Sequence, residues 1–446
     1  MSTISLPEEK RIISKIAWKL IPYIVFLYII SMIDRVNIGF AALTMNKELG
    51  IDPATYGLIA GIFFLSYFIF EVPSNVAMHQ FGARKWIARI LITWGIIVVA
   101  EGFVKNATQL IILRTLLGAA EAGFYPAMLL YLTYWFPDKY QGRAVALFML
   151  GSVTANMIGG PISGLIMDKV VLFGMSGWRW AFILEGIPAI IFGILTFFIL
   201  VDRPNQADFL SNDEKDWLIG ELDRELKEKH KKALYNASHW VVLKNPCVWH
   251  MSISYLFYNT GVYALFLWMP QVITEFSKIL SPTQVGFFSA IPYLCTAFVM
   301  TAIAHHSDKT NERRLHVALP ILVGFVSLIA LTKVSSLTMS ISLLSVGLAF
   351  TMSFVGSFWT IPNLTLSAAH AAVGLAMINS VGNLGGFIGP YIVGWIKSLT
   401  GSAIPGMYFL ALMCLCASIS ILIIPKRLVT PHPIQEIQSI SNVITK

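Results

Sequence analysis

The sequence predicts an all-α membrane protein with twelve transmembrane helices in two six-helix pseudo-repeats. Mean hydropathy is +0.70 and only 13% of the 446 residues are charged. The hydrophobic fraction of 56% exceeds the ~45–50% that is usual for soluble domains. The apolar residues gather in runs of about 20, which is the length that crosses a bilayer as a helix. One long polar stretch, near 202–246, divides these runs into two groups.

The apolar runs give six predicted helices on each side of this stretch. Those before it lie near 18–42, 56–78, 87–105, 108–134, 140–166 and 178–201. Those after it lie near 247–275, 284–305, 316–333, 336–360, 370–396 and 404–424. Residues 7–11 mix acids and bases, and no small-residue cleavage site follows the first run. We therefore expect the first helix to be retained and not removed as a signal peptide.

Basic residues cluster in alternate loops of this predicted arrangement. The clusters are Lys10, Arg11, Lys15 and Lys19, then Arg84, Lys85 and Arg89, then Lys139 and Arg143, and finally Lys309, Arg313 and Arg314. The intervening loops carry isolated cations such as Lys47 and Lys278. Because cytoplasmic loops carry an excess of Lys and Arg, both termini are predicted to be cytoplasmic. The membrane placement also explains the net charge of +8 without nucleic acid as a partner.

The predicted domain boundaries follow from the polar stretch. Residues 1–201 form an N-terminal six-helix bundle, 202–246 a cytoplasmic linker, 247–430 a C-terminal six-helix bundle and 431–446 a cytoplasmic tail. Within the linker, Ser211 and Glu214 match a capping box, and leucines recur at 218, 222 and 226. This pattern predicts an amphipathic helix. A solvated linker without partners and a helix docked on the membrane surface both remain open.

The two halves repeat each other at a fixed offset. Gly160-Pro161 and Gly389-Pro390 are 229 residues apart (389 − 160). The basic loops that begin at His79 and Asp308 have the same separation (308 − 79 = 229). Parallel repeats with a binding site between them are a known design of secondary transporters.

Two acid–base pairs interrupt the apolar runs and are the main functional candidates. Asp34 and Arg35 lie in the first run, and Arg114 and Glu121 lie in the fourth. A charge at membrane depth costs at least ~2.5–3.5 kcal/mol, so these side chains are expected to face a polar path and not lipid.

The spacing of these residues predicts their partners. Arg114, Gly118, Glu121 and Tyr125 are expected to share one helix face, but Arg114 and Glu121 are ~10 Å apart along the axis. They are therefore expected to pair with Asp34 and Arg35 of the first helix and not with each other. Asn37, three residues after Asp34, is expected to support that carboxylate.

These residue types have a direct chemical use together. A buried carboxylate binds a proton readily unless a guanidinium stabilises its charge. An organic anion that competes for the guanidinium leaves the carboxylate free to take up a proton. Arginine suits such an anion because its planar fork binds a carboxylate bidentately.

Structural interpretations compete with this one at each position. The Asp34–Arg35 and Glu121 groups also fit an inert ion pair that holds helices together. We interpret Glu71 and Glu185 as structural residues, because Glu71 lies close to Pro73 and Glu185 follows an aromatic run. Other polar or aromatic residues within the runs are more typical of helix packing: Tyr67, Asn156, Tyr258, Asn259, Trp359, Asn379 and Asn383. Helix breakers near 357–362 and 382–389 predict interrupted helices there.

Five segments together match a known family. They are DRVNIGF (34–40), GARKW (82–86), RTLLGAAEAGF (114–124), GWRWAFILEG (177–186) and the stretch 379–390. On these motifs the chain resembles the major facilitator superfamily over nearly its whole length, and within it the anion:cation symporter family. It is most similar to the bacterial branch of tartrate, phthalate, hydroxyphenylacetate and sugar-acid permeases.

The resemblance implies proton-coupled symport of a small carboxylate by alternating access, in a bacterial inner membrane and as a monomer. It implies Asp34 and Glu121 as proton-coupling acids and Arg35 and Arg114 as their partners, which also bind substrate. Tyr67, Trp359 and Asn379 match positions that line the substrate cavity. Gly82, Arg84, Asp308 and Arg313, with Asn37, match gating or structural positions. His79 departs from the family, which usually has an acid there.

Other classes of function remain as alternatives. A drug or metabolite efflux antiporter is one, and a ligand sensor on a carrier fold is another. The chain has no His-Glu-x-x-His, Gly-x-Ser-x-Gly or Gly-Lys sequence, so we expect neither an enzyme nor a bound cofactor or metal. The expected partners are protons, a small organic anion and the lipid bilayer.

Overall fold

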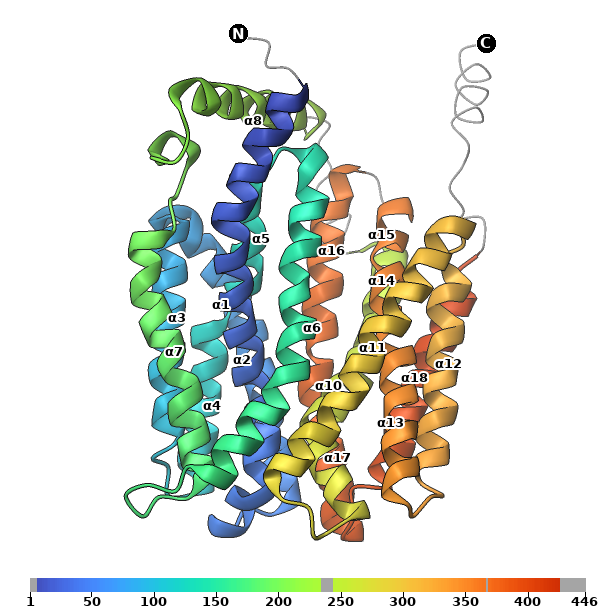
Figure 1. Cartoon of the computed structure of the whole chain (residues 1–446). Helices are drawn as coiled ribbons and strands as arrows, with labels where there is room; N and C mark the ends of the chain where they lie inside the picture. The colour runs from blue at the N-terminus through green and yellow to red at the C-terminus, as the bar shows by residue number, and fades with distance from the viewer. Residues whose placement is uncertain (1–5, 234–243, 366–367, 426–446) are drawn as a thin grey trace.

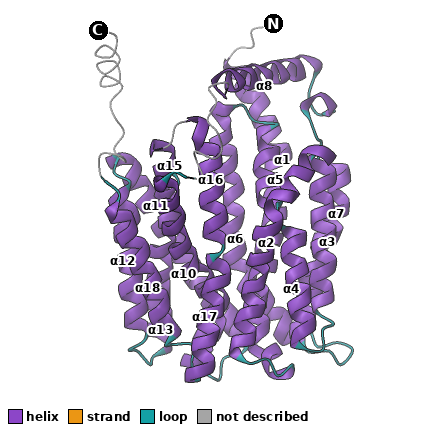
Figure 2. Ribbon diagram, turned by 180° about the vertical axis from the view of Figure 1, so that it is seen from behind, coloured by secondary structure: helices purple, strands orange, loops and turns teal. Residues whose placement is uncertain are grey.

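The computed structural model describes residues 6–233, 244–365 and 368–425. Within these ranges it consists of helices and connecting loops, without strands, arranged as two side-by-side bundles (Figures 1 and 2). The predicted tail at 431–446 lies outside the described residues.

The first bundle is built from seven helices. They are α1 (Leu6–Glu48), α2 (Pro53–Phe81), α3 (Ala83–Glu101), α4 (Ala107–Glu121), α5 (Phe124–Thr133), α6 (Asp138–Lys169) and α7 (Gly177–Ile199). The helices α4 and α5 form one interrupted span. The interruption is at Gly123, whose φ of +86° is a left-handed conformation that glycine adopts without strain.

A short linker leads to the second bundle through η1 (Pro204–Gln206) and α8 (Asn212–Ala233). The second bundle contains α10 (Pro246–Phe276), α11 (Pro282–Thr310), α12 (Arg314–Leu331), α13 (Leu337–Met352), α14 (Phe354–Phe358), α15 (Thr360–Thr365), α16 (Ala368–Asn383), α17 (Gly385–Thr400) and α18 (Gly406–Ile423). The breaks after Phe358 and Asn383 fall where the sequence predicts interrupted helices.

Within the described residues, nine segments are long and apolar enough to cross a membrane. They include α4 with α5, and α13 with the two short helices after it. The shorter or more polar α3, α10 and the α16–α17 pair complete a twelve-helix arrangement. The fold class predicted from the sequence is therefore confirmed.

The pseudo-repeat is visible in how equivalent helices begin. Asp52 caps α2, which starts at Pro53, and Ser281 caps α11, which starts at Pro282. The two prolines are again 229 residues apart (282 − 53). Each N-cap side chain accepts hydrogen bonds from the first free backbone amides, so each repeat specifies this helix start locally.

We call the end of the molecule that carries α8, the start of α1 and the end of α18 the linker end (Figure 1). At the opposite, far end the two bundles meet closely. A Cβ at Gly57 of α2 would lie 2.6 Å from the carbonyl oxygen of Pro390 in α17. Gly160 and Gly286 make the equivalent backbone contact between α6 and α11. Glycine allows this approach because any larger residue would force the helices apart.

The linker helix α8 is attached to the first bundle. The predicted capping box is confirmed, because the Ser211 amide donates to Glu214 (2.9 Å) and the Glu214 amide donates to the Ser211 hydroxyl (3.3 Å). The Lys15 ammonium of α1 also donates to Glu214 (2.8 Å). The Asp138 amide at the start of α6 donates to Glu225 (3.0 Å). The helix therefore has protein partners, contrary to the solvated-linker interpretation.

Candidate functional site

Arg35 and Glu121 form an ion pair between α1 and α4. The Arg35 Nε donates to Glu121 Oε1 at 2.8 Å, and the Ser31 hydroxyl donates to the same oxygen at 2.8 Å. The Glu121 side chain is 1% exposed and that of Arg35 is 14% exposed. The Arg35 Nη2 has no hydrogen-bond partner among the described residues. The expected partner of Glu121 on the first helix is thus confirmed, and one guanidinium donor remains available.

Aromatic rings of α2 lie beside both buried guanidinium groups. The Arg35 guanidinium is 5.1 Å from the centre of the Tyr67 ring and 5.6 Å from that of Phe63. The Arg114 guanidinium is 5.4 Å from the same Phe63 ring. Gly118 brings α4 this close, because a Cβ there would clash with the Phe63 carbonyl oxygen. Ring faces attract cations and stabilise both arginines without neutralising them.

Asp34 has a different partner from the one that the sequence predicts. Its Oδ2 accepts a hydrogen bond from the Trp94 indole of α3 at 2.7 Å, while its Oδ1 is buried with no hydrogen-bond partner in the described ranges. The Asn37 amide oxygen and nitrogen are both buried with no hydrogen-bond partner in the described ranges, so Asn37 does not support Asp34. Three residues along α1 turn the helix by about 300°, so the two side chains leave the helix in directions about 60° apart.

The predicted partner of Arg114 is also wrong. Arg114 lies 3.5 Å from Glu101 at the end of α3, and both side chains are almost fully buried. Neither Asp34 nor Arg35 makes a described ion pair with it. The α4 helix presents Arg114 to α3 and Glu121, two turns later, to α1, so the two residues pair with different neighbours.

Glu71 and Asn379 connect the two bundles. The Asn379 side-chain amide of α16 lies 3.4 Å from Glu71 Oε1 of α2. Glu71 is 6% exposed, and its charge also interacts with Arg35. The sequence indicates a structural role for Glu71, but the contact places it at the meeting point of the two halves.

The second bundle contributes a group of stacked aromatic rings. Trp359, at the break between α14 and α15, packs edge-on against Tyr255 of α10 with ring centres 5.0 Å apart. Tyr255 also stacks on Phe358 at 5.4 Å, and Tyr258 stacks on Phe354 at 4.2 Å. Unlike the first bundle, this region offers rings and neutral polar groups but no buried charge among the described residues.

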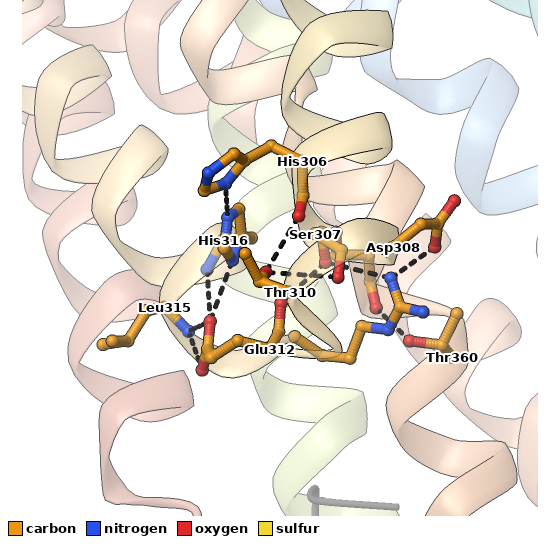
Figure 3. A network of polar contacts seen from close by, with 10 residues as sticks. His306, Ser307, Asp308, Thr310, Glu312, Leu315, His316 and Thr360 are labelled. Atoms are coloured by element: carbon orange, nitrogen blue, oxygen red, sulfur yellow. Dashed lines mark hydrogen bonds and ion pairs between the residues drawn. The ribbon is translucent and has the colours of Figure 1, made fainter.

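Four of the predicted gating or structural residues, namely Gly82, Arg84, Asp308 and Arg313, lie in or beside the loops at the linker end, whereas Asn37 lies within α1. Gly82, between α2 and α3, has a φ of +85°. Two residues later, the backbone amide of Arg84 donates to Asp202 at 2.7 Å. Asp202, beyond the end of α7, thus supplies an acid to this loop. In the second half, Arg313 donates to Asp308 at 2.5 Å and to the Ser307 hydroxyl at 3.0 Å. Figure 3 shows Ser307 and Asp308 within this network of polar contacts.

Sequence reasoning missed four partners. Trp94 binds Asp34, and Glu101 binds Arg114. Asp202 binds the first basic loop. Glu185 accepts a hydrogen bond from Ser163 at 2.7 Å. A usable signal existed for Glu101 and Glu185, since both are acids at or within apolar runs. In the described ranges, no group of three or more His, Cys, Asp or Glu residues is arranged to hold a metal ion.

The arrangement is suited to binding an anion and a proton. Arg35 has a free donor, and Glu121 becomes an unpaired buried carboxylate whenever another anion occupies Arg35. An unpaired buried charge is costly, so such a carboxylate takes up a proton.

Known proteins resemble this chain along most of its length. A family model described as "Major Facilitator Superfamily" matches residues 24–390. An Agrobacterium vitis protein named "Putative tartrate transporter" is 41% identical over 423 residues, covering 94% of this chain and 95% of that protein. A "Quinolone resistance transporter" from Acinetobacter baumannii is 39% identical, with 91% and 93% covered.

A solved structure has the same fold. It is a bacterial homologue of the human lysosomal transporter Spinster, in an inward-facing and unoccupied conformation. Its TM-score is 0.74 at 15% sequence identity, and the match covers 94% of this chain and 99% of the other. At this identity the likeness concerns the fold alone.

Proposed function

Because the chain belongs to the Major Facilitator Superfamily, and so is a membrane transporter and not an enzyme, we propose that it carries a small organic anion together with a proton. The proposed substrate is a carboxylate such as a sugar acid, tartrate or an aromatic acid. The observation that carries the proposal is the Arg35–Glu121 pair, in which the Arg35 Nη2 has no hydrogen-bond partner among the described residues.

Coupling follows from competition at Arg35. A carboxylate that binds the guanidinium displaces Glu121, which is then buried without a cation and binds a proton. The loaded centre carries the same net charge as the empty one, since the anion and the proton cancel. Release of the anion restores the Arg35–Glu121 pair and expels the proton. Asp34, whose one hydrogen bond among the described residues comes from the Trp94 indole, is the second proposed proton-coupling acid.

The remaining contacts to the substrate are assigned by position. Tyr67 lies against Arg35, and Asn379 reaches Glu71 from the second bundle, so we propose that both contact the body of the substrate. We propose the same role for Trp359, which packs on Tyr255 within the second bundle. We do not assign Arg114 to the substrate, because its guanidinium is paired with Glu101 and 1% exposed.

Alternating access requires that one end open while the other closes. Tight glycine contacts shut the far end, so we assign this state to access from the linker end. The basic loops at the linker end make it the cytoplasmic side of a bacterial inner membrane. The loops with Gly82, Arg84, Asp308 and Arg313 then lie where the cytoplasmic gate would close. We propose that the monomer transports.

The test is uptake by purified protein in lipid vesicles. An inward proton gradient should concentrate one member of a panel of carboxylates, including tartrate, and dissipating the gradient should abolish the accumulation. Binding is screened first by thermal shift, since a ligand stabilises the state to which it binds. If no carboxylate is accumulated under any gradient, proton-coupled symport is wrong.

A second candidate is an efflux antiporter, which the quinolone-resistance relative favours. It predicts that an outward substrate movement is driven by an opposite proton movement. The same vesicles distinguish the two: symport moves substrate and proton in one direction, and antiport moves them in opposite directions.

A further inference from the structure

Hydrogen bonds join the two bundles at the far end, and the mechanism above does not use them. The Asp168 carboxylate, in the last turn of α6, accepts from the backbone amide of Thr283 in α11 at 2.9 Å. The Thr283 hydroxyl donates to the Gly164 carbonyl of α6 at 3.2 Å. The Tyr56 hydroxyl of α2 donates to the Leu267 carbonyl of α10 at 3.0 Å. Each bond crosses from one bundle to the other, so it exists only while the far end is closed.

Asp168 completes the start of α11, which the residues of that helix cap only in part. An α-helix begins with four backbone amides that have no partner within the helix. The Ser281 hydroxyl accepts from one of them, that of Gln284, at 3.3 Å. The Thr283 amide is satisfied by Asp168 of the other bundle. A carboxylate suits this place because the start of a helix carries a partial positive charge.

The equivalent helix start in the first repeat is capped within its own bundle. Asp52 lies 229 residues before Ser281 (281 − 52). Its carboxylate accepts from the amides of both Ala54 and Thr55, at 2.9 and 3.1 Å. The corresponding two amides of α11 are divided between Ser281 and Asp168. The second repeat therefore depends on the first bundle for a cap that the first repeat supplies itself.

The reverse contact is not made by the residue that corresponds to Asp168. At the same offset this residue is Lys397 (168 + 229), and it pairs with Glu275 inside the second bundle at 3.1 Å. Around Asp168 the α6–α11 contact is close, since a Cβ at Gly164 would clash with the Pro282 carbonyl oxygen. Asp168 itself is only partly buried. Water can therefore hydrate this carboxylate as soon as the two helices separate.

We propose that Asp168 holds the far end closed by capping α11 across the bundle interface, and that this end opens when the bond breaks. Asp168 is then a positioning residue for alternating access, and the inference rests on the proposed function. In the closed state the carboxylate and the Thr283 amide satisfy each other, and in the open state water satisfies both. Such an exchange has a modest net cost, so the bond can break and form again in each transport cycle.

The test measures whether the α6–α11 interface opens. Ser289 lies seven residues after Pro282 and three after Gly286, so it shares the face of α11 that contacts α6, and it is 2% exposed. Ser289→Cys places a thiol at this interface. A membrane-impermeant maleimide is added to the full-length protein in lipid nanodiscs, and mass spectrometry follows alkylation at position 289. The native Cys414, buried inside the second bundle, is the internal reference.

In this background, Asp168→Ala should raise the rate of alkylation at position 289 about tenfold, because a charge-assisted hydrogen bond across the interface is lost. Asp168→Asn keeps the shape and an acceptor oxygen but not the charge, so we expect about a threefold rise. This variant also covers the case in which Asp168→Ala does not fold. Cys414 should stay protected, because the bundles move as rigid bodies. No rise at position 289, or an equal rise at Cys414, overturns the proposal.

Asn106→Ala is the matched control. Asn106 caps α4 at the same end of the molecule by accepting from the Gln109 amide at 2.9 Å, but both residues belong to the first bundle. Its loss should leave alkylation at position 289 unchanged. A rise as large as that of Asp168→Ala would mean that any lost cap loosens this end, and the proposal would be wrong. Alkylation needs neither substrate nor a proton gradient, so it decides the role of Asp168 even if proton-coupled symport fails.

Discussion

The two bundles share a fold and a helix order but differ in what they bury. In the first bundle, five acids and two arginines are buried or nearly so. In the described part of the second bundle, the buried polar side chains are serine, threonine, asparagine and glutamine, and its stacked rings include Tyr255 and Phe358. Duplication thus preserved the scaffold while the chemistry of the interiors diverged.

The difference indicates a division of labour. The proposed function requires groups that change protonation to be held away from lipid in fixed positions, and the first bundle has buried acids on α1, α3 and α4. The second bundle faces them with groups whose charge does not change. We expect substitutions in the first bundle to alter coupling and those in the second to alter recognition. The predictions below test this division, starting with the largest expected effect.

Replacing the anion-binding arginine should have the largest effect. Arg35→Lys keeps the charge but loses the planar fork, so we expect about a hundredfold weaker carboxylate binding, as for other buried charged contacts that cost about 3 kcal/mol. Arg203→Lys is the matched control, because Arg203 also lies over a tyrosine ring, that of Tyr134, but away from the site. Thermal shift and counterflow measure the binding. Equal affinity in Arg35→Lys and wild type would remove Arg35 from the anion site.

Neutralising the acid of the pair should separate exchange from accumulation. Glu121→Gln should still exchange substrate across the membrane but should no longer accumulate it. In wild type, the ratio of internal to external substrate should rise about tenfold per unit of pH gradient, and in the variant it should not rise. The control in the second bundle, Glu275→Gln, should accumulate normally, because Glu275 pairs with Lys397 at 3.1 Å in a partly exposed position. If Glu275→Gln abolishes accumulation as well, the division between the bundles fails.

A neutral contact in the second bundle should change affinity alone. Asn379→Ala removes one amide near Glu71, and we expect KM to rise about five- to tenfold, in line with about 1–1.5 kcal/mol for one hydrogen bond. The dependence of uptake on pH should stay as in wild type. A shifted pH profile would show that the second bundle takes part in coupling through Glu71.

The sequence predicts the scaffold better than the pairing of its buried charges. Apolar runs, N-caps and helix breakers act locally, so the helices, the Ser211–Glu214 box and the breaks near Trp359 and Asn383 are all found where the sequence places them. The sequence also predicts the Arg35–Glu121 pair. In a straight helix Glu121 is too far from Arg114 to pair with it, so its cationic partner must come from the first helix.

The predicted partners of Asp34 and Arg114 are wrong because they depend on how each helix is rotated and on which helix packs against it. Glu101 lies at the end of α3, and only the packing of α3 on α4 brings it to Arg114. Trp94 reaches Asp34 for the same kind of reason. Glu71 meets Asn379 across 308 residues of chain. Periodicity gives the face of a helix, but it does not say which helix lies opposite that face.

The smallest expected effect concerns the linker, whose charges tie it to the first bundle. Burial raises the pKa of the Glu214 carboxyl, but hydrogen bonds from Lys15 and the Ser211 amide, with the charges of Lys15 and Arg11, outweigh burial and hold the pKa below its ordinary value. A lowered pKa means that this carboxylate stabilises the folded state at neutral pH. The contribution is lost as the pH falls from about 4.3, the unfolded value, through the folded one.

Glu214→Gln tests this contact without removing the cap, since glutamine still accepts from the Ser211 amide. Surface ion pairs contribute about 0.2–1 kcal/mol, so we expect the melting temperature at pH 7 to fall by about 1–2 °C. The difference from wild type should shrink as the pH falls from about 4.3 and vanish once the pH is below the folded pKa, where neither protein carries a charge at this position. A difference that persists in acid would mean that Glu214 acts through its shape and not its charge, and the linker would then be attached to the first bundle by packing alone.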